Sequence, residues 1–128
     1  MQLVIGNKNY SSWSMRPWVA MRHFDIDFDE VQLWIFTESW PQDIAVYGSN
    51  TVPVLVTEQG NVVDSLAILE TVAEDCPQMW PRDRHLRAKA REACARMHSG
   101  FSSLRSEMPM NCRAVNGSWS SVPRESCG

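Results

Sequence analysis

The sequence has no apolar run that approaches the roughly 18 residues of a membrane-spanning helix. Its N-terminus has no basic leader, long apolar stretch or small-residue cleavage site. Basic residues are not in excess, since 12 Lys and Arg face 15 Asp and Glu, giving a formal net charge of -3. A uniformly basic nucleic-acid binder is therefore disfavoured. We expect a cytoplasmic protein with no membrane and no nucleic-acid partner.

Cysteine is sparse and widely spaced. Cys76, Cys94, Cys112 and Cys127 form no Cys-x-x-Cys pair. In an acidic cytosolic protein such cysteines are most simply reduced thiols. Cys94 and His98 are four residues apart on a predicted helix, but no second pair of ligands accompanies them. We therefore expect no metal site.

The length of 128 residues, with 44% hydrophobic side chains, fits one domain, or one domain and a fragment of a second. Hydrophobic patterning and turn residues predict a series of short elements in the first part of the chain. These are strands at 3–5, 28–35, 52–56 and 62–63, helices at 11–23 and 66–75, and a loop that can hold one helical turn at 37–50. This order predicts an α/β fold with a mixed four-stranded sheet, in which the first two strands are parallel.

The last part of the chain differs in character. After a linker at 78–81 we predict one long helix over about 82–107, and an irregular tail over 111–128. The long helix carries an apolar stripe. Its members are Leu86, Ala90, Ala93, Met97, Phe101, Leu104 and Met108. A stripe of this length predicts a packing partner, so we expect a homodimer or a higher oligomer.

Charge is unevenly distributed along the chain. Residues 22–75 are strongly acidic and contain a single basic side chain, Arg22, whereas residues 82–107 are mainly basic. The favoured interpretation is two solvated faces of one globule. The alternative is a basic helix that docks on an acidic neighbour.

Serines crowd the junction between the first strand and the first helix, at Ser11, Ser12 and Ser14. Free N–H groups and the helix dipole concentrate positive potential there, which suits an anion such as a thiolate. A hydroxyl at this position can also donate to that anion. The alternative is ordinary N-capping by serine.

Two further features precede later elements. At Val52-Pro53, a cis peptide bond would turn the Val52 N–H and C=O outward, where they can pair with an extended peptide; otherwise this is an ordinary edge-strand proline. At Asp64-Ser65, the carboxylate can accept a bond from a ligand ammonium, and the serine N–H and hydroxyl can hold a carboxylate. The alternative is again a helix cap.

Three stretches in this order, 10–18, 52–55 and 64–68, carry a resemblance. They read YSSWSMRPW, VPVL and DSLAI, and together they resemble the N-terminal thioredoxin-like domain of bacterial glutathione S-transferases, most closely the serine-type, zeta-like enzymes. The resemblance implies a thioredoxin-like glutathione-binding domain over 1–77. It also implies that 82–110 is the first helix of an all-α C-terminal domain.

The resemblance further implies residue roles. Ser11 occupies the position of the family's catalytic serine or cysteine, with Ser12 as the adjacent candidate. Val52, before Pro53, would pair with the cysteinyl backbone of glutathione, and Asp64 and Ser65 would hold its γ-glutamyl end. Glutathione would then be the co-substrate, and its thiolate would attack a small electrophile.

The chain also departs from the family's pattern. The family has a further helical bundle that supplies most of the electrophile pocket, and we expect this chain to carry only the start of it. Thr51 stands where many relatives have a basic residue. The alternative function is therefore a non-catalytic glutathione-binding or protein-interaction module. A thioredoxin-type oxidoreductase is disfavoured, because 11–14 contains no cysteine to act as nucleophile.

Overall fold

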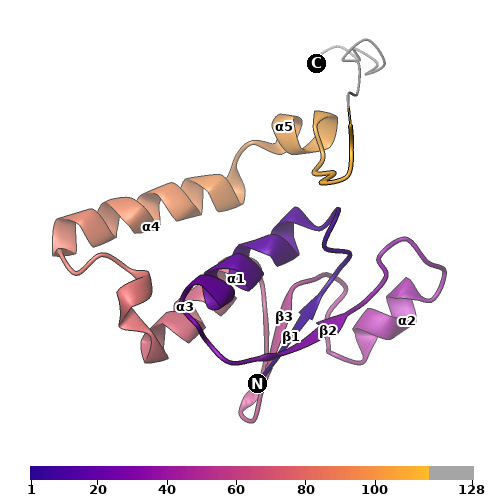
Figure 1. Ribbon diagram of the computed structural model, residues 1–128, viewed down its shortest axis with the longest axis horizontal. Coiled ribbons are helices and arrows are strands. Elements are labelled where there is room, and N and C mark those ends of the chain that lie inside the picture. The colour runs from indigo at the N-terminus through magenta and orange to yellow at the C-terminus, as the bar shows by residue number, and fades with distance from the viewer. Residues whose placement is uncertain (116–128) are drawn as a thin grey trace.

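The computed structural model describes residues 1–115 and shows a four-stranded sheet flanked by helices (Figure 1). The strands are β1 (Gln2–Ile5), β2 (Asp29–Gln32), β3 (Val54–Thr57) and β4 (Gly60–Val63). Their spatial order is β2-β1-β3-β4. β1 pairs with β2 in parallel and with β3 antiparallel, and β3 pairs antiparallel with β4. The predicted fold, a mixed four-stranded α/β sheet of the thioredoxin-like type, is confirmed.

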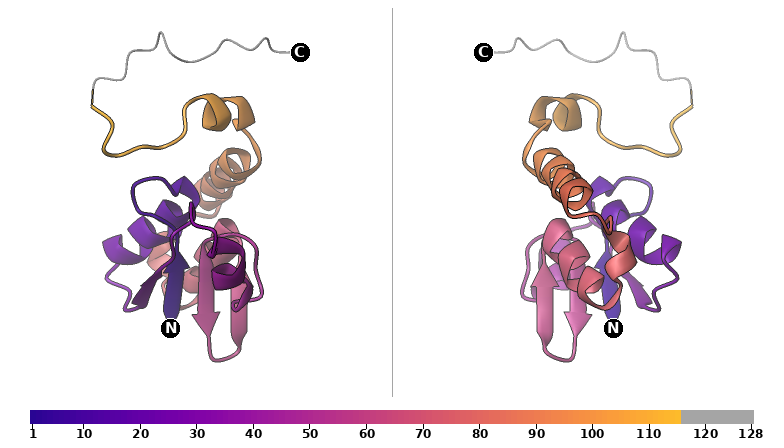
Figure 2. Two further views of the ribbon diagram at one scale, coloured as in Figure 1. Left: turned by 90° about the vertical axis from the view of Figure 1, so that its right-hand side faces the viewer. Right: turned by 90° about the vertical axis from the view of Figure 1, so that its left-hand side faces the viewer.

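Helices lie on both faces of the sheet and extend beyond it (Figures 1 and 2). They are α1 (Ser12–His23), α2 (Trp40–Ala45), α3 (Ser65–Asp75), the short 3-10 helix η1 (Pro77–Met79), α4 (Arg84–Ser99) and α5 (Ser102–Glu107). Within residues 1–115, no helix combines the length and hydrophobicity needed to cross a membrane.

The core has two layers because side chains alternate across β1. Leu3 and Ile5 face α1 and α3 and pack in one cluster with Met21 and Ile68. Val4 points to the opposite face, where it packs with residues that include Ile44 of α2. All of these side chains are at most 1% exposed. Burial on both faces fixes the register of β1 and hence the place where its carboxyl end meets α1.

Two elements differ in extent from their sequence-based predictions. The second strand is shorter than 28–35, since the ladder with β1 covers only Asp29–Gln32, although the Leu33 N–H still donates to the Ile5 carbonyl. The segment 37–50 contains a helix rather than a single turn. Pro41 lies in the first turn of that helix, where a missing N–H costs little, and Ile44 anchors it to the sheet.

The prediction of a single long helix over 82–107 is wrong, because the helix is interrupted at Gly100. The Gly100 N–H donates to the Arg96 carbonyl, and a Cβ on Gly100 would lie 2.7 Å from that same oxygen. Phe101 then adopts a left-handed backbone with φ 60°. Arg105 of α5 donates back to the carbonyls of Met97 and Gly100, which stabilises the bend.

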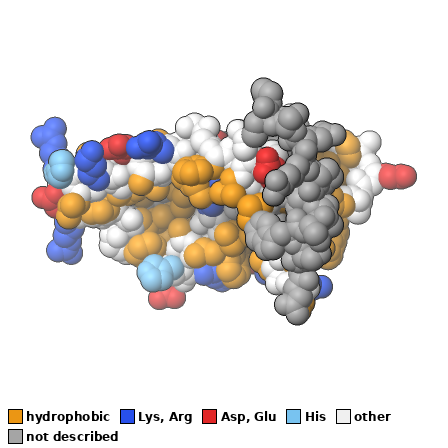
Figure 3. All heavy atoms as spheres, turned by 90° about the horizontal axis from the view of Figure 1, so that it is seen from above, with side chains coloured by type: hydrophobic (Ala, Val, Ile, Leu, Met, Phe, Trp, Pro, Cys, Tyr) orange, Lys and Arg blue, Asp and Glu red, His pale blue; other side chains and the backbone are white. Residues whose placement is uncertain are grey.

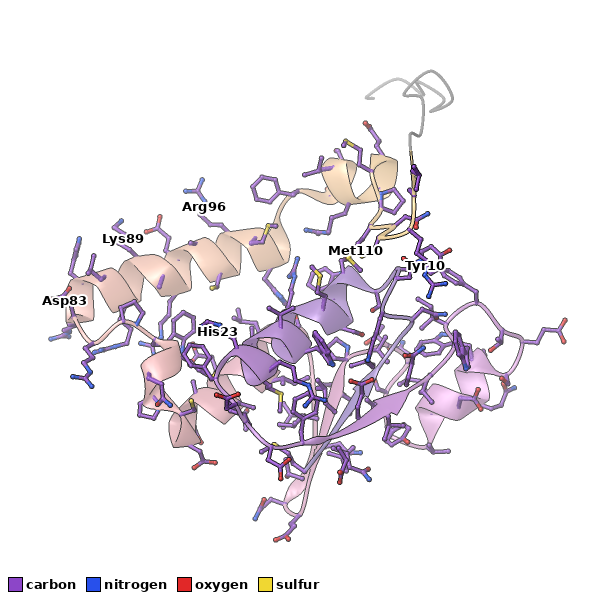
Figure 4. The ribbon with its side chains drawn as sticks, in the orientation of Figure 1. Tyr10, His23, Asp83, Lys89, Arg96 and Met110 are labelled. Carbon is purple, nitrogen blue, oxygen red and sulfur yellow. The ribbon has the colours of Figure 1, made fainter. Side chains whose placement is uncertain are left out.

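The segment after α5 returns to the loop that follows β1. The Cys112 N–H donates to the Asn9 carbonyl at 3.2 Å, and Asn111 bonds the Asn9 side chain. Met110 and Tyr10 mark these two segments in Figure 4. Most of the predicted irregular tail, from residue 116 onward, lies outside the described residues, as does Cys127. The domain boundaries at 77, 81 and 110 remain predictions.

Candidate functional site

The first turn of α1 and the bend before β3 meet at Gly6. A Cβ added to Gly6 would lie 3.2 Å from the Ser11 Cβ and 3.2 Å from the Val52 Cγ2, and 2.8 Å from Ile35. Only glycine permits this close approach. Two of the three segments singled out in the sequence therefore lie side by side, although 40 residues separate them along the chain.

A pocket of about 250 Å³ opens where the third segment joins them. Its lining residues are Trp13 from α1, Thr51, Val52 and Pro53 from the bend, Asp64 and Ser65 at the start of α3, and His98 from α4. The Val52–Pro53 peptide bond is cis. Four of the predicted binding residues thus surround one pocket.

Several polar groups at this pocket have no partner among the described residues. β3 begins only at Val54, so the Val52 N–H and C=O lie outside the ladder and are unpaired. The Ser65 side chain is 2% exposed, yet its hydroxyl is unsatisfied. In the first turn of α1, the Trp13 N–H is free, while those of its neighbours are bonded. Among these groups the Ser65 hydroxyl stands out, because buried polar groups are nearly always paired.

Asp64 combines a cap with a second contact. It is the N-cap of α3 at a positive φ of 89°, and its Oδ1 accepts from the N–H groups of Leu66 and Ala67 at 2.9 and 3.0 Å. Its other oxygen, Oδ2, lies 2.8 Å from the Nε2 of His98. The capping alternative considered from the sequence is therefore present, and it uses one carboxylate oxygen while His98 contacts the other.

Neither candidate catalytic serine lines this pocket. Ser11 is the N-cap of α1 and is 7% exposed; its hydroxyl donates to the Ser14 hydroxyl at 2.8 Å and accepts from the Ser14 N–H at 3.3 Å. Ser14 in turn accepts from the Gly6 N–H at 3.0 Å. Ser11 lines a smaller cavity of about 210 Å³ on the Trp18 side of α1. Ser12 opens α1 and is only partly buried.

Sequence reasoning missed Trp13 and His98 as site residues. Trp13 lies inside the serine-rich stretch, and its adjacency to those serines was the available signal. His98 lies in α4, 34 residues after Asp64 in the sequence, so no local pattern indicates that the two side chains meet. Its ring meets Trp13 edge to face, with centroids 5.3 Å apart.

Cations surround the Trp13 ring. The guanidinium carbon of Arg16 lies 4.0 Å from the ring centroid and that of Arg105 lies 5.0 Å away. Burial lowers the pKa of Arg16, and the positive charge of Arg105 lowers it further, while Asp64 opposes both effects. Neither guanidinium forms a salt bridge within residues 1–115. Two guanidiniums without a salt bridge in the described part of the chain therefore lie over Trp13, one of the residues that line the pocket.

Two further cavities lie outside the polar pocket. A cavity of about 850 Å³ surrounds the β3–β4 turn and the end of α3, far from these segments along the sheet. A more apolar cavity of about 430 Å³ separates α1, α3 and α4, and it shares Ser65 and His98 with the polar pocket. In the part of the chain that the structure describes, no three His, Cys, Asp or Glu side chains gather in a metal-binding cluster.

Solved structures similar to this chain are glutathione transferases. A glutathione transferase homolog from Burkholderia gl BGR1, with bound glutathione, is 24% identical, with a TM-score of 0.65 over 82% of this chain and 56% of the other. A Tau class glutathione S-transferase from mango is 18% identical, with a TM-score of 0.62 over 83% and 50%. A rice GST in complex with glutathione is 20% identical, with a TM-score of 0.60 over 84% and 52%.

At these identities the structures establish the fold, and the chain spans about half the length of each. No curated protein matches the chain. A family model described as "Glutathione S-transferase, N-terminal domain" matches residues 10–75, more than half of the chain. That range contains the first turn of α1, the Val52-Pro53 bend and the start of α3. The chain belongs to the glutathione S-transferase family.

Proposed function

We propose that the pocket between α1, the bend and α3 binds glutathione. The unpaired main chain of Val52 beside the start of α3 is the observation that carries this proposal. The Val52 N–H and C=O would pair with the cysteinyl backbone of the tripeptide in the manner of an added strand. Asp64 would attract the γ-glutamyl ammonium, and the Ser65 hydroxyl and N–H would hold its carboxylate.

The thiol would then lie at the first turn of α1. A free thiol has a pKa of about 8.5, so ionisation at neutral pH needs a shift of ~2 units, or ~2.7 kcal/mol. A hydroxyl that donates to a charge contributes about 1.5–3 kcal/mol, and a helix terminus adds ~0.3–1 kcal/mol. We propose that Ser11, or its neighbour Ser12, supplies the hydroxyl and that the free Trp13 N–H adds to the terminus. The thiolate would attack a small electrophile, as in a glutathione transferase.

A second candidate function is a non-catalytic glutathione-binding or protein-interaction module. It is favoured by one observation: the Ser11 hydroxyl is buried and already satisfied by Ser14. To donate to a thiolate, Ser11 would have to give up that bond. A module that binds the tripeptide without ionising its thiol requires no such change.

Other aspects of the function are proposals as well. We propose a cytoplasmic location, because glutathione keeps thiols reduced there and because Cys76, Cys94 and Cys112 are unpaired. The zeta-like subclass rests on the serine-rich stretch alone. Thr51 lines the pocket where many relatives have a basic residue, so we expect a weak contact with the glycyl carboxylate.

The test of glutathione binding is calorimetry on the wild type and on Asp64→Asn. Asparagine caps helices well and tolerates a positive φ, so this variant should fold normally. Loss of the charge should weaken glutathione binding about tenfold, since an ion pair at a partly shielded site contributes on the order of 1 kcal/mol or more.

The matched control is Asp83→Asn, the same change at the N-cap of α4, where Asp83 accepts from the Leu86 N–H at 2.9 Å. This variant should bind glutathione like the wild type. Equal loss in both variants, or no binding heat with the wild type, contradicts the proposal.

A further inference from the structure

His98 is the only contribution of α4 to the lining of the proposed glutathione pocket, among the described residues. It is held there by two contacts with different elements. Its Nε2 lies 2.8 Å from the Asp64 Oδ2 at the start of α3, and its ring packs edge to face on Trp13 of α1. The side chain is 27% exposed, so solvent reaches it from one side.

His98 contacts the Asp64 carboxylate oxygen that would bind the ammonium group of a ligand. Oδ1 of Asp64 is committed to the N–H groups of Leu66 and Ala67, which cap α3. Oδ2 is therefore the oxygen available to an ammonium group, and the imidazole of His98 already lies against it. The other ring nitrogen, Nδ1, is buried and has no partner within residues 1–115. An arriving ammonium must share Oδ2 with His98 or displace it.

We propose that His98 is a positioning residue that sets the pH dependence of glutathione binding by competing, when protonated, with the γ-glutamyl ammonium for Asp64. This inference rests on the proposed glutathione site. Neutral His98 leaves the charge of Asp64 uncompensated, so Asp64 attracts the ammonium. Protonated His98 neutralises that charge and repels the ammonium. Affinity should therefore fall as the pH is lowered.

The charged groups that face His98 come from four elements. They are Asp64 at the start of α3, Arg16 of α1, Cys94 one turn earlier on α4, and Arg105 of α5, which lies over the Trp13 ring that His98 contacts. Arginine stays protonated, and ordinary carboxylates and thiols titrate below and above the range from about pH 5.5 to about pH 8. Imidazole is the group that titrates inside it. A change in affinity that is present in the wild type and absent from His98→Gln therefore reports on His98.

The experiment measures the dissociation constant of S-methylglutathione by calorimetry from about pH 5.5 to about pH 8. S-methylation removes the titrating thiol of the ligand and keeps its ammonium. The wild type should bind about fivefold more weakly at the acid end, the size expected for one partly exposed charge pair. His98→Gln keeps an N–H donor near the Nε2 position and cannot titrate, so its affinity should be constant across the range.

N-acetylated S-methylglutathione, which has no ammonium, is the second probe and needs no variant. Its affinity for the wild type should not weaken at acid pH. The inference is overturned if His98→Gln keeps the wild-type pH profile, or if the acetylated ligand weakens as much as the parent. Wild type that binds S-methylglutathione equally well at all pH values overturns this inference alone. Wild type that binds neither ligand at any pH overturns the proposed function with it.

Discussion

The hydroxyl of Ser11 stabilises the start of α1 in the structure. It could donate to a thiolate only by giving up its hydrogen bond to Ser14. As N-cap of α1 it bonds the Ser14 N–H and the Ser14 hydroxyl. Ser11→Ala should therefore cost about 1 kcal/mol of stability through loss of the cap. It should also lower kcat/KM for a generic electrophile by about tenfold or more, because a charge-assisted hydrogen bond is lost. Glutathione affinity should stay within about threefold of wild type.

Ser12→Ala is the paired variant for this prediction, since Ser12 is the first residue of α1 and the N-cap among the described residues is Ser11. It should retain turnover and stability. If Ser12→Ala is damaging and Ser11→Ala is silent, the catalytic role belongs to Ser12. If both variants and the wild type bind glutathione without turnover, the non-catalytic module is the correct function.

At the level of elements, the site depends on how closely the loop after β1 approaches α1 and the bend. Gly6→Ala would place a Cβ 2.8 Å from the Ile35 side chain and 3.2 Å from Ser11 and Val52. Relief of these contacts must push the segments apart. We expect a loss of about 1–3 kcal/mol in the free energy of unfolding, measured by denaturant titration, and weaker glutathione binding.

Gly48→Ala separates those two effects. Gly48 has a φ of +70° and open space around its Cα, so alanine there is strained but touches nothing. It should cost about 1 kcal/mol of stability and leave glutathione affinity unchanged. Unaltered affinity in Gly6→Ala would show that the spacing around Gly6 does not matter to the site.

Local patterns predicted most of the α/β elements because their signals are local. Asp64 before an apolar stripe marks the start of α3, and the run 3–5 marks the buried β1. The break at Gly100 was missed because the apolar stripe continues through it. It depends instead on the close approach of Gly100 to the Arg96 carbonyl, which leaves no room for a Cβ, and on the hydrogen bonds of Arg105, and no periodicity reveals either.

For the molecule as a whole, the apolar side chains of α4 and α5 remain uncovered within the described residues. Leu86, Phe101 and Leu104 are 58%, 57% and 50% exposed. Viewed from above, hydrophobic side chains are exposed over the visible part of this side of the molecule (Figure 3), while Lys89 and Arg96 point away from the α/β domain (Figure 4). The expected partner for the predicted stripe is thus absent from the described fold.

We predict that the chain self-associates through these side chains, because exposed apolar surface of this kind drives association. Light scattering at micromolar concentration should give a mass of at least twice the 14.6 kDa of one chain. Replacing Phe101 and Leu104 with serine should lower that mass. A monomeric mass for the unaltered protein would contradict the prediction.

The sequence predicted which segments would matter, and the structure brings them around one pocket. Val52 and Ser65 present groups there that have no partner among the described residues, and their roles in binding stay predictions. The hypothesis did not anticipate that Ser11 would turn inward or that His98 would reach Asp64. Both depend on how side chains are oriented in the folded molecule, and the order of residues along the chain does not predict that orientation.

Backbone amide NMR during a glutathione titration tests the central claim most directly. The account predicts that the signals of Trp13, Val52 and Ser65 shift first and together, because their N–H groups line the pocket without partners. The amides of 57–61, around the larger cavity at the β3–β4 turn, should not move. Shifts confined to that turn, or no shifts at any amide, would contradict the claim that glutathione binds between α1, the bend and α3.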